Sequence, residues 1–226
     1  MKRTASIEAL ISKSRTTFED LKKQYDASLS EKLVREELKV DLKNIFENLR
    51  SVLDYLAHEI FEATCAGQKL PSRLYFPIRG SASEFSAAVN KAFPSLQVSA
   101  PGIFAALEAV QPYKDVWLGD FNLLNNANKH LNLTEQTRTE AREVRVSNAN
   151  ASVSWGPGVT FGDGVSVVGV RIDPRTQMPV PNRTTTTEVI IWVDFKFSDN
   201  GKSVLPFVEE SITKVSDLVR ELQKYI

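Results

Sequence analysis

The stretch LKVDLKNIFENLRSVLDYLAHEI, residues 38–60, decides the fold of the first half of this chain. Its apolar residues recur every three or four positions, which is the spacing of one face of an α-helix. The stripe consists of Leu38, Leu42, Ile45, Leu49, Val52, Leu53, Leu56 and Ile60. Because such a stripe packs against neighbouring helices, we expect a long helix from about Ser30 to Thr64, ended by Gly67.

Helical spacing also precedes and follows this stretch. An amphipathic segment from about Ser6 to Asp26 predicts a first helix, joined to the second by a turn near Ala27-Ser28 in an antiparallel hairpin. We expect a short extended piece at Leu74-Tyr75-Phe76. Further helices are expected over 83–92, from Pro101-Gly102 to Val110, and from about Trp117 toward Leu131.

Beyond residue 140 the composition becomes typical of β-strands, rich in β-branched and aromatic residues. The predicted strands are Ala141–Val146, Ser152–Trp155, Val165–Ile172 and Thr184–Phe197. Helical spacing returns from Val204 to Ile226. We therefore expect an α+β fold, with an antiparallel helical bundle over 1–132, a small antiparallel sheet inserted at 133–200, and a C-terminal helix over 201–226 that packs back on the bundle.

Charge and cysteine content limit the classes of function. Lys and Arg total 28, as do Asp and Glu, so the formal net charge is zero and no global field attracts nucleic acid. Any RNA contact would depend on a local basic patch. The single cysteine, Cys65, fits a reducing compartment, and no apolar run is long enough to span a bilayer. We expect a cytoplasmic protein with no membrane contact.

Three polar residues follow one side of the second predicted helix. At about 100° per residue, Asp54 lies roughly 40° and His58 roughly 80° from Arg50, opposite the apolar stripe. Histidine suits proton transfer, arginine binds phosphate, and Asp54 could orient either of them. The alternative interpretation is an ordinary solvated helix face with an Arg–Asp surface pair four residues apart.

The second histidine, His130, ends an amide-rich cluster that starts at Asn125 and includes Asn128 and Lys129. A histidine near the end of a helix commonly interacts with the helix dipole, so a structural role is the alternative to chemistry here. Two distant histidines and one cysteine give no familiar metal-ligand spacing, and there is no phosphate-binding glycine loop. We expect no metal and no cofactor.

Four short blocks together resemble a group of uncharacterised bacterial and phage proteins related to the HEPN superfamily. Residues 48–56, NLRSVLDYL, resemble that group's "LRSALDHL" helix. Residues 75–78, 110–113 and 123–130 resemble its "FPI", "QPY" and "L..L.N.DKHR" blocks, in the same order. The resemblance covers about Asp41 to Leu131; the strands and the final helix lie outside it.

The resemblance implies a HEPN-like helical bundle that is usually dimeric. Many HEPN proteins are metal-independent RNases of toxin–antitoxin and antiphage systems, with an Arg-x(4–6)-His motif paired across the dimer. Arg50 matches the motif arginine and Asp54 the polar position before the histidine. Tyr55 occupies the Arg-x4-His position, and His58 follows at a longer spacing than the motif has. In the last block, Asn128 stands for the usual Asp and Leu131 for the Arg.

Two functions follow as expectations. In the first, the protein is an RNase in which His58 is the general acid or base, Arg50 stabilises the phosphate and Asp54 orients. Tyr55, Asn128, Lys129 and His130 are then secondary, and the partners are RNA, a second copy and an antitoxin. In the second, the protein is a non-catalytic, HEPN-like dimeric binding or scaffold protein whose sheet recognises a protein or small ligand. The absent motif histidine and the zero net charge favour the second, whereas the retained Arg50 and Asp54 with a nearby histidine favour the first.

Overall fold

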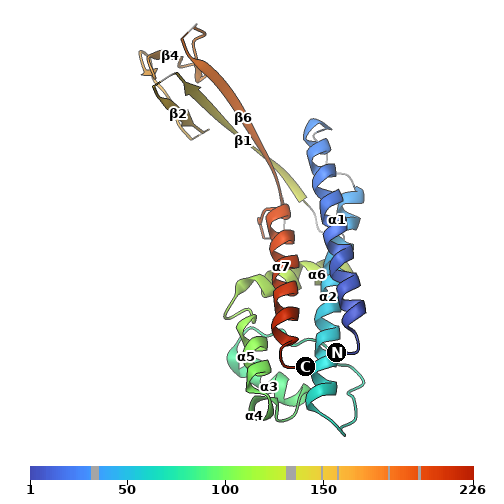
Figure 1. Ribbon diagram of the computed structural model, residues 1–226. Helices are drawn as coiled ribbons and strands as arrows, with labels where there is room; N and C mark the ends of the chain where they lie inside the picture. The colour runs from blue at the N-terminus through green and yellow to red at the C-terminus, as the bar shows by residue number, and fades with distance from the viewer. Residues whose placement is uncertain (32–35, 131–135, 149, 157, 183, 198–199) are drawn as a thin grey trace. The chain divides into compact units, whose positions relative to one another are not determined.

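The computed structural model describes residues 1–31, 36–130, 136–148, 150–156, 158–182, 184–197 and 200–226. The side chains of 26–31, 36, 128–130, 136–143 and 188–195 are outside this description. The predicted α+β class and C-terminal helix are confirmed: the described residues form seven helices and two small three-stranded antiparallel sheets (Figure 1). Two compact units result, a helical unit (Met1–Thr137 with Lys196–Ile226) and a β unit (Arg138–Phe195).

Three long helices form the main part of the helical unit. Helices α1 (Thr4–Glu31) and α2 (Glu36–Thr64) run antiparallel, and α7 (Val204–Leu222) packs against both (Figure 1). All eight residues of the predicted α2 stripe are at most 1% exposed. Burial of such a stripe removes apolar surface from water, which is the dominant favourable contribution to folding.

The predicted turn at Ala27-Ser28 is wrong, because α1 continues through both residues to Glu31. The predicted start of the second helix at Ser30 is wrong for the same reason: that residue belongs to α1, and α2 begins at Glu36. No Gly or Pro occurs in residues 26–31. Alanine has the highest helix propensity, so the local sequence allows α1 to continue.

An aromatic cluster holds α2, α6 (Val116–His130) and α7 together. The ring of Phe46 lies 5.6 Å from Phe121, 6.1 Å from Phe197 and 6.3 Å from Phe207, measured between centroids. Trp117 stacks on Phe121 at 5.8 Å and donates its indole N–H to Ser211 Oγ at 3.0 Å. All of these side chains are at most 3% exposed, so the cluster is the core of the helical unit.

Three short helices cover the end of α2. They are α3 (Ala82–Ala92), α4 (Leu96–Ser99) and α5 (Pro101–Ala109). Helix α3 begins where the Ser81 hydroxyl accepts the Glu84 N–H, and it packs on α5 through Phe85 and Phe104, 5.3 Å apart. The sequence predicts α3 and α5 but not the single turn of α4. Leu74-Tyr75-Phe76 forms no strand; its backbone bonds to side chains instead, as described below.

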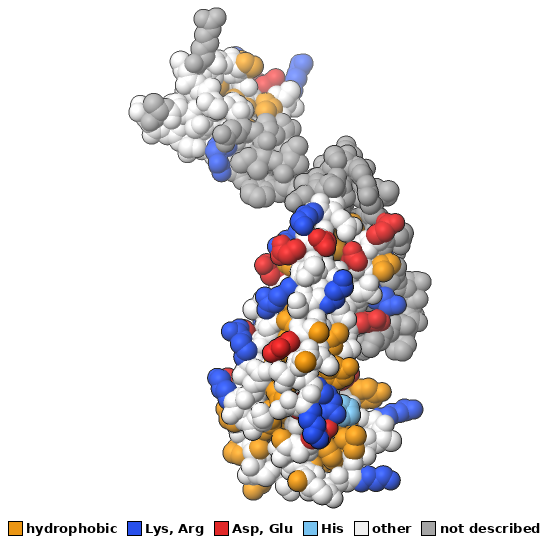
Figure 2. Space-filling view, turned by 45° about the vertical axis from the view of Figure 1, so that its right-hand side comes forward, with side chains coloured by type: hydrophobic (Ala, Val, Ile, Leu, Met, Phe, Trp, Pro, Cys, Tyr) orange, Lys and Arg blue, Asp and Glu red, His pale blue; other side chains and the backbone are white. Residues whose placement is uncertain are grey.

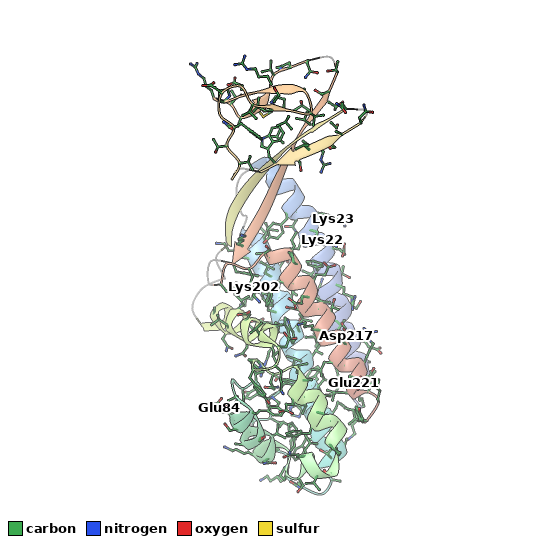
Figure 3. All side chains as sticks on the ribbon, turned by 90° about the vertical axis from the view of Figure 1, so that its left-hand side faces the viewer. Lys22, Lys23, Glu84, Lys202, Asp217 and Glu221 are labelled. Atoms are coloured by element: carbon green, nitrogen blue, oxygen red, sulfur yellow. The ribbon has the colours of Figure 1, made fainter. Side chains whose placement is uncertain are left out.

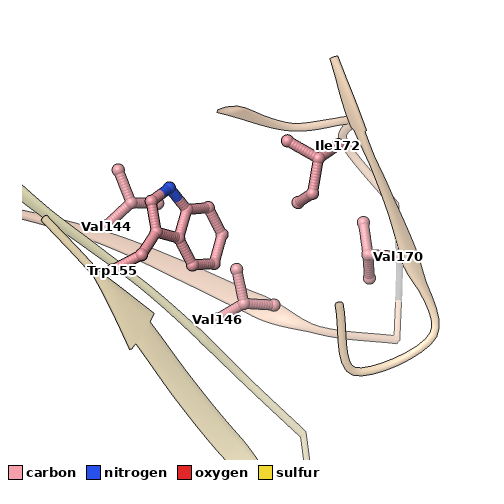
Figure 4. Packing of buried hydrophobic residues seen from close by; sticks show 5 residues of the cluster. All are labelled: Val144, Val146, Trp155, Val170 and Ile172. Atoms are coloured by element: carbon pink, nitrogen blue, oxygen red, sulfur yellow. The ribbon is translucent and has the colours of Figure 1, made fainter. Parts of the chain in front are cut away.

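The β unit has its own small core. One sheet has the order β2–β1–β6, from β1 (Gln136–Ser147), β2 (Ser152–Trp155) and β6 (Thr186–Phe197). The other has the order β3–β4–β5, from β3 (Ser166–Val167), β4 (Val170–Asp173) and β5 (Met178–Pro179). Figure 4 shows the buried side chains between them: Val144, Val146, Trp155, Val170 and Ile172.

The predicted single strand from Val165 to Ile172 is wrong, because the chain reverses within it. Val168 has φ 53° and Gly169 has φ 79°, and β3 pairs with β4 across this two-residue turn. A two-residue turn with two successive positive φ values has a backbone twist that matches the right-handed twist of the two strands it joins. Glycine adopts the second of these conformations without strain. The region therefore forms two sheets rather than one.

No helix in the described residues is long and apolar enough to cross a membrane.

An ion pair joins the start of α6 to α7. Asp115 Oδ2 lies 2.5 Å from Lys214 Nζ, and Asp115 Oδ1 accepts the Trp117 N–H at 3.2 Å. Burial alone would raise the pKa of Asp115, but Lys214 and the Trp117 N–H outweigh it and hold that pKa below 3.8. The pair also holds the pKa of Lys214 above 10.5, against the effect of burial.

A carboxyl group whose pKa is lower in the folded state than in the unfolded state stabilises the fold at pH values above its unfolded-state pKa. That contribution is lost as the pH falls through the folded-state pKa. We therefore expect Asp115→Asn to lower the free energy of unfolding by about 1 kcal/mol at pH 7, since both side chains are about a third exposed. The difference in the free energy of unfolding between Asp115→Asn and the wild type should shrink steadily below pH 3.8. Urea unfolding across this pH range measures it, and a difference that does not change with pH would contradict the assignment.

Candidate functional site

Arg50 and Asp54, one turn apart on α2, form a partly buried ion pair that holds the backbone of Phe76. Asp54 Oδ1 lies 3.1 Å from Arg50 Nη2 in an ion pair and accepts a hydrogen bond from the Phe76 N–H at 2.9 Å. Arg50 Nη2 also donates to the Phe76 carbonyl at 3.4 Å. The two side chains are only 13% and 23% exposed. The pair is therefore not the solvated surface pair that the alternative interpretation of the sequence expected.

Gln111, at the end of α5, holds the same segment from another direction. Its side chain is fully buried; Nε2 donates to the carbonyls of Pro77 and Leu107, both at 2.9 Å, and Oε1 accepts the Arg79 N–H at 2.9 Å. Residues 71–79 are called here the anchored segment, because hydrogen bonds at Phe76, Pro77 and Arg79 hold it to α2 and to the end of α5. Irregular backbone in a protein interior needs such partners for its N–H and carbonyl groups.

Three of the four blocks that carry the HEPN resemblance meet at this segment. Arg50 and Asp54 come from the first block, Phe76 and Pro77 from the second, and Gln111 from the third. Gln111 was not among the predicted site residues. The one sequence signal for it is its place in the third block, residues 110–113.

His58 is not brought into this arrangement. It lies one helical turn beyond Asp54, about 6 Å along the axis. The side chain is half-buried, and its Nδ1 is buried without a hydrogen-bond partner. Within the described residues no hydrogen bond or ion pair joins His58 to Arg50 or Asp54, and Tyr55 makes none with them either. The structure therefore brings together two of the three predicted stripe residues.

The carboxylate next to His58, that of Glu59, binds the backbone just before α1. Glu59 is 4% exposed and accepts the backbone N–H groups of Lys2 and Arg3 at 2.7 and 2.9 Å. Glu62 pairs with the side chains of the same two residues, which lower the pKa of Glu62 to about 2. Glu59 satisfies backbone N–H groups just before α1 and Glu62 pairs with two side chains there, so both carboxylates are already engaged by partners other than His58.

The amide-rich block lies on the second half of α6. Asn128, Lys129 and His130 are in its last turn, but their side chains lie outside the described part of the structure. Asn125 is buried, and its Oδ1 has no hydrogen-bond partner among the described residues. No group of three or more His, Cys, Asp or Glu side chains placed to hold a metal ion occurs in the described ranges.

A cavity of about 410 Å³ opens beside the anchored segment. Four cationic side chains line it: Arg50, Arg73, Arg79 and Lys91. Its described lining includes Asn122 of α6 but no Asp or Glu. The volume lies within the range of small-molecule sites, roughly 300–1,000 Å³. The sequence predicts only Arg50 among these, because Arg73 and Arg79 reach the cavity through the path of the 71–79 segment and Lys91 through the packing of α3.

Comparison with known proteins found no matching family model, no matching curated protein and no matching solved structure. The relationship to HEPN proteins is therefore an inference from the four sequence blocks.

The geometry predicts a structural role for Asp54 that depends on its oxygen more than on its charge. Asp54→Ala removes the acceptor of the Phe76 N–H and the partner of Arg50, and it should lower the free energy of unfolding by about 2 kcal/mol. Asp54→Asn keeps an oxygen for the Phe76 N–H and should cost roughly half as much. Urea unfolding of the two variants tests this. Equal, negligible costs would show that the segment does not depend on Asp54.

Proposed function

We propose that this chain is a non-catalytic, HEPN-like binding or scaffold protein that works as a dimer. The observation that carries the proposal is the engagement of the Arg50–Asp54 pair with the Phe76 backbone. A catalytic arginine must be free to contact a phosphate, and a catalytic acid or base must be oriented toward the reacting atoms. Here the motif arginine and its aspartate are both used to hold the anchored segment.

The position of the histidine supports the same proposal. Tyr55 stands at the motif position, and within the described residues the nearest histidine on the helix, His58, makes no hydrogen bond or ion pair with the Arg50–Asp54 pair. General acid–base catalysis needs the histidine within hydrogen-bond distance of the proton that it transfers. Arg50 would have to leave Phe76 and Asp54 before the two groups could act on one phosphate.

The dimer and the recognition role come from the resemblance and from the domain organisation. HEPN-like proteins are usually dimeric. The β unit has its own buried cluster around Trp155, so its surface residues are free to recognise a partner without supporting the helical core. We assign partner recognition to the β unit and dimerisation to the helical unit.

A metal-independent RNase is the second candidate. One observation favours it: Nη1 of Arg50 and Nδ1 of His58 are both buried without a hydrogen-bond partner, on the same helix. Buried polar atoms without partners are uncommon and gather at functional sites. A role in a toxin–antitoxin or antiphage system belongs to this second candidate, because in those systems the RNase activity is what harms the cell.

RNA cleavage in EDTA separates the two functions. We expect the full chain to leave single-stranded RNA intact, and the His58→Gln and Arg50→Ala variants to do the same, because His58 makes no described hydrogen bond or ion pair with Arg50 or Asp54. Denaturing gels of end-labelled RNA measure the product. Sedimentation of the same samples should show a dimer.

Cleavage by the wild-type protein that His58→Gln abolishes would contradict the proposal and support the RNase. His58 makes no described hydrogen bond, so this variant should keep its fold, which circular dichroism verifies. Arg50→Ala alone would not decide the question, since it also releases Phe76. A monomer at all concentrations would contradict the dimer.

A further inference from the structure

We propose that the cavity beside the anchored segment binds a small molecule that carries an oligophosphate group. This proposal does not rest on the HEPN-like function; it rests on the charge and shape of the cavity. Three of its four cations, Arg73, Arg79 and Lys91, lie outside the polar stripe of α2.

The cavity carries an unbalanced positive charge. Four cationic side chains line it, and one carboxylate, Asp54, pairs with Arg50, which leaves a charge of 4 − 1 = +3. Within the described residues Arg73, Arg79 and Lys91 form no ion pair; Arg79 donates only to the carbonyl of Ile78, at 2.7 Å. A phosphomonoester carries about −1.5 to −2 at neutral pH, so two phosphates match this charge better than one.

The cations are presented by backbone that is already fixed. Leu74 and Phe76 are buried and hold this part of the segment against the helical unit. Arg73 and Tyr75, which alternate with them, are exposed. Gln111 holds the backbone N–H of Arg79. On α3, Ala88, Lys91 and Ala92 share one face, and the two alanines leave space beside the ammonium group. Preorganised donors lower the ordering cost of binding an anion.

The guanidinium group of Arg50 is a second observation that supports anion binding in this cavity. It lines the cavity, and its Nη1 is buried without an acceptor among the described residues. A buried N–H without a partner costs about 1–3 kcal/mol relative to a satisfied one. Because Nη1 is buried, Arg50 would attract a phosphate in the cavity through its positive charge and not by direct contact, while Nη2 stays at Asp54 and Phe76.

The distribution of charge favours a compact ligand over a nucleic acid. Several lysines elsewhere on the helical unit, labelled in Figure 3, have carboxylate partners: Lys22 with Glu19 at 2.6 Å, Lys23 with Asp20 at 3.2 Å, and Lys202 with Asp120 at 2.6 Å. Figure 2 shows positive and negative side chains interspersed over the face of this unit that it presents. A nucleic-acid strand needs a continuous basic track, whereas here three cations without a described ion pair line a single cavity, Arg73, Arg79 and Lys91.

Calorimetric titration of the full chain with inorganic pyrophosphate, in EDTA and at low ionic strength, tests the proposal. We expect saturable binding at one site. Lys91→Gln and Arg73→Gln should each weaken it about tenfold, since each removes a charge-assisted contact from an exposed side chain that does not support the fold. Lys69→Gln is the matched control: Lys69 is exposed and near in sequence but does not line the cavity, so binding should stay within about twofold of wild type.

Three outcomes would overturn the proposal. The first is no heat of binding with pyrophosphate. The second is equal weakening by Lys69→Gln and Lys91→Gln, which would show a diffuse electrostatic effect. The third is binding of single-stranded RNA, weakened by the same cavity variants, without binding of pyrophosphate, which would make the cavity part of a nucleic-acid site. None of these outcomes bears on whether the protein cleaves RNA in EDTA.

Discussion

The described geometry of the site depends on the hydrogen bond from the Phe76 N–H to Asp54 Oδ1. Without it, residues 71–79 would be an irregular segment with buried Leu74 and Phe76 side chains and an unpaired backbone N–H. With it, and with Gln111 holding Pro77 and Arg79, the segment has a defined path. That path places Arg73 and Arg79 at the cavity, so a single carboxylate on α2 connects the helix core to the candidate ligand site.

This constraint also separates the two candidate functions. Arg50 and Asp54 resemble the polar pair of a nuclease motif when they are considered along the helix alone. In three dimensions their polar atoms bond to each other and to the Phe76 backbone, and His58 lies one turn away. The same residues therefore contribute to stability first, and a contribution to chemistry would require that the anchored segment be released. The proposed oligophosphate site avoids this conflict, because the exposed Arg73, Arg79 and Lys91 would contact the ligand while Arg50 adds its charge and stays paired with Asp54.

Much of the fold could be predicted because it depends on periodicity. The α2 stripe is buried at every predicted position, and β2 has the predicted limits, since both patterns are local consequences of helix and strand geometry. The errors at Ala27-Ser28 and at Val168-Gly169 have the opposite cause. There the conformation depends on one or two dihedral angles, and composition does not fix them. The candidate site was predictable only in part. Spacing places Arg50 and Asp54 together on one side of a helix, but spacing along one helix does not show that Gln111, far along the chain, bonds to the loop that Asp54 holds.

Amide hydrogen exchange at Phe76, measured by NMR on the wild-type chain and on Asp54→Ala, tests the central claim most directly. The account predicts that the Phe76 amide is strongly protected in the wild type, and that Asp54→Ala increases its exchange far more than that of amides within α2, because local opening then exposes it. Rapid exchange at Phe76 in the wild type, or protection that the variant retains, would contradict the claim that Asp54 anchors this segment.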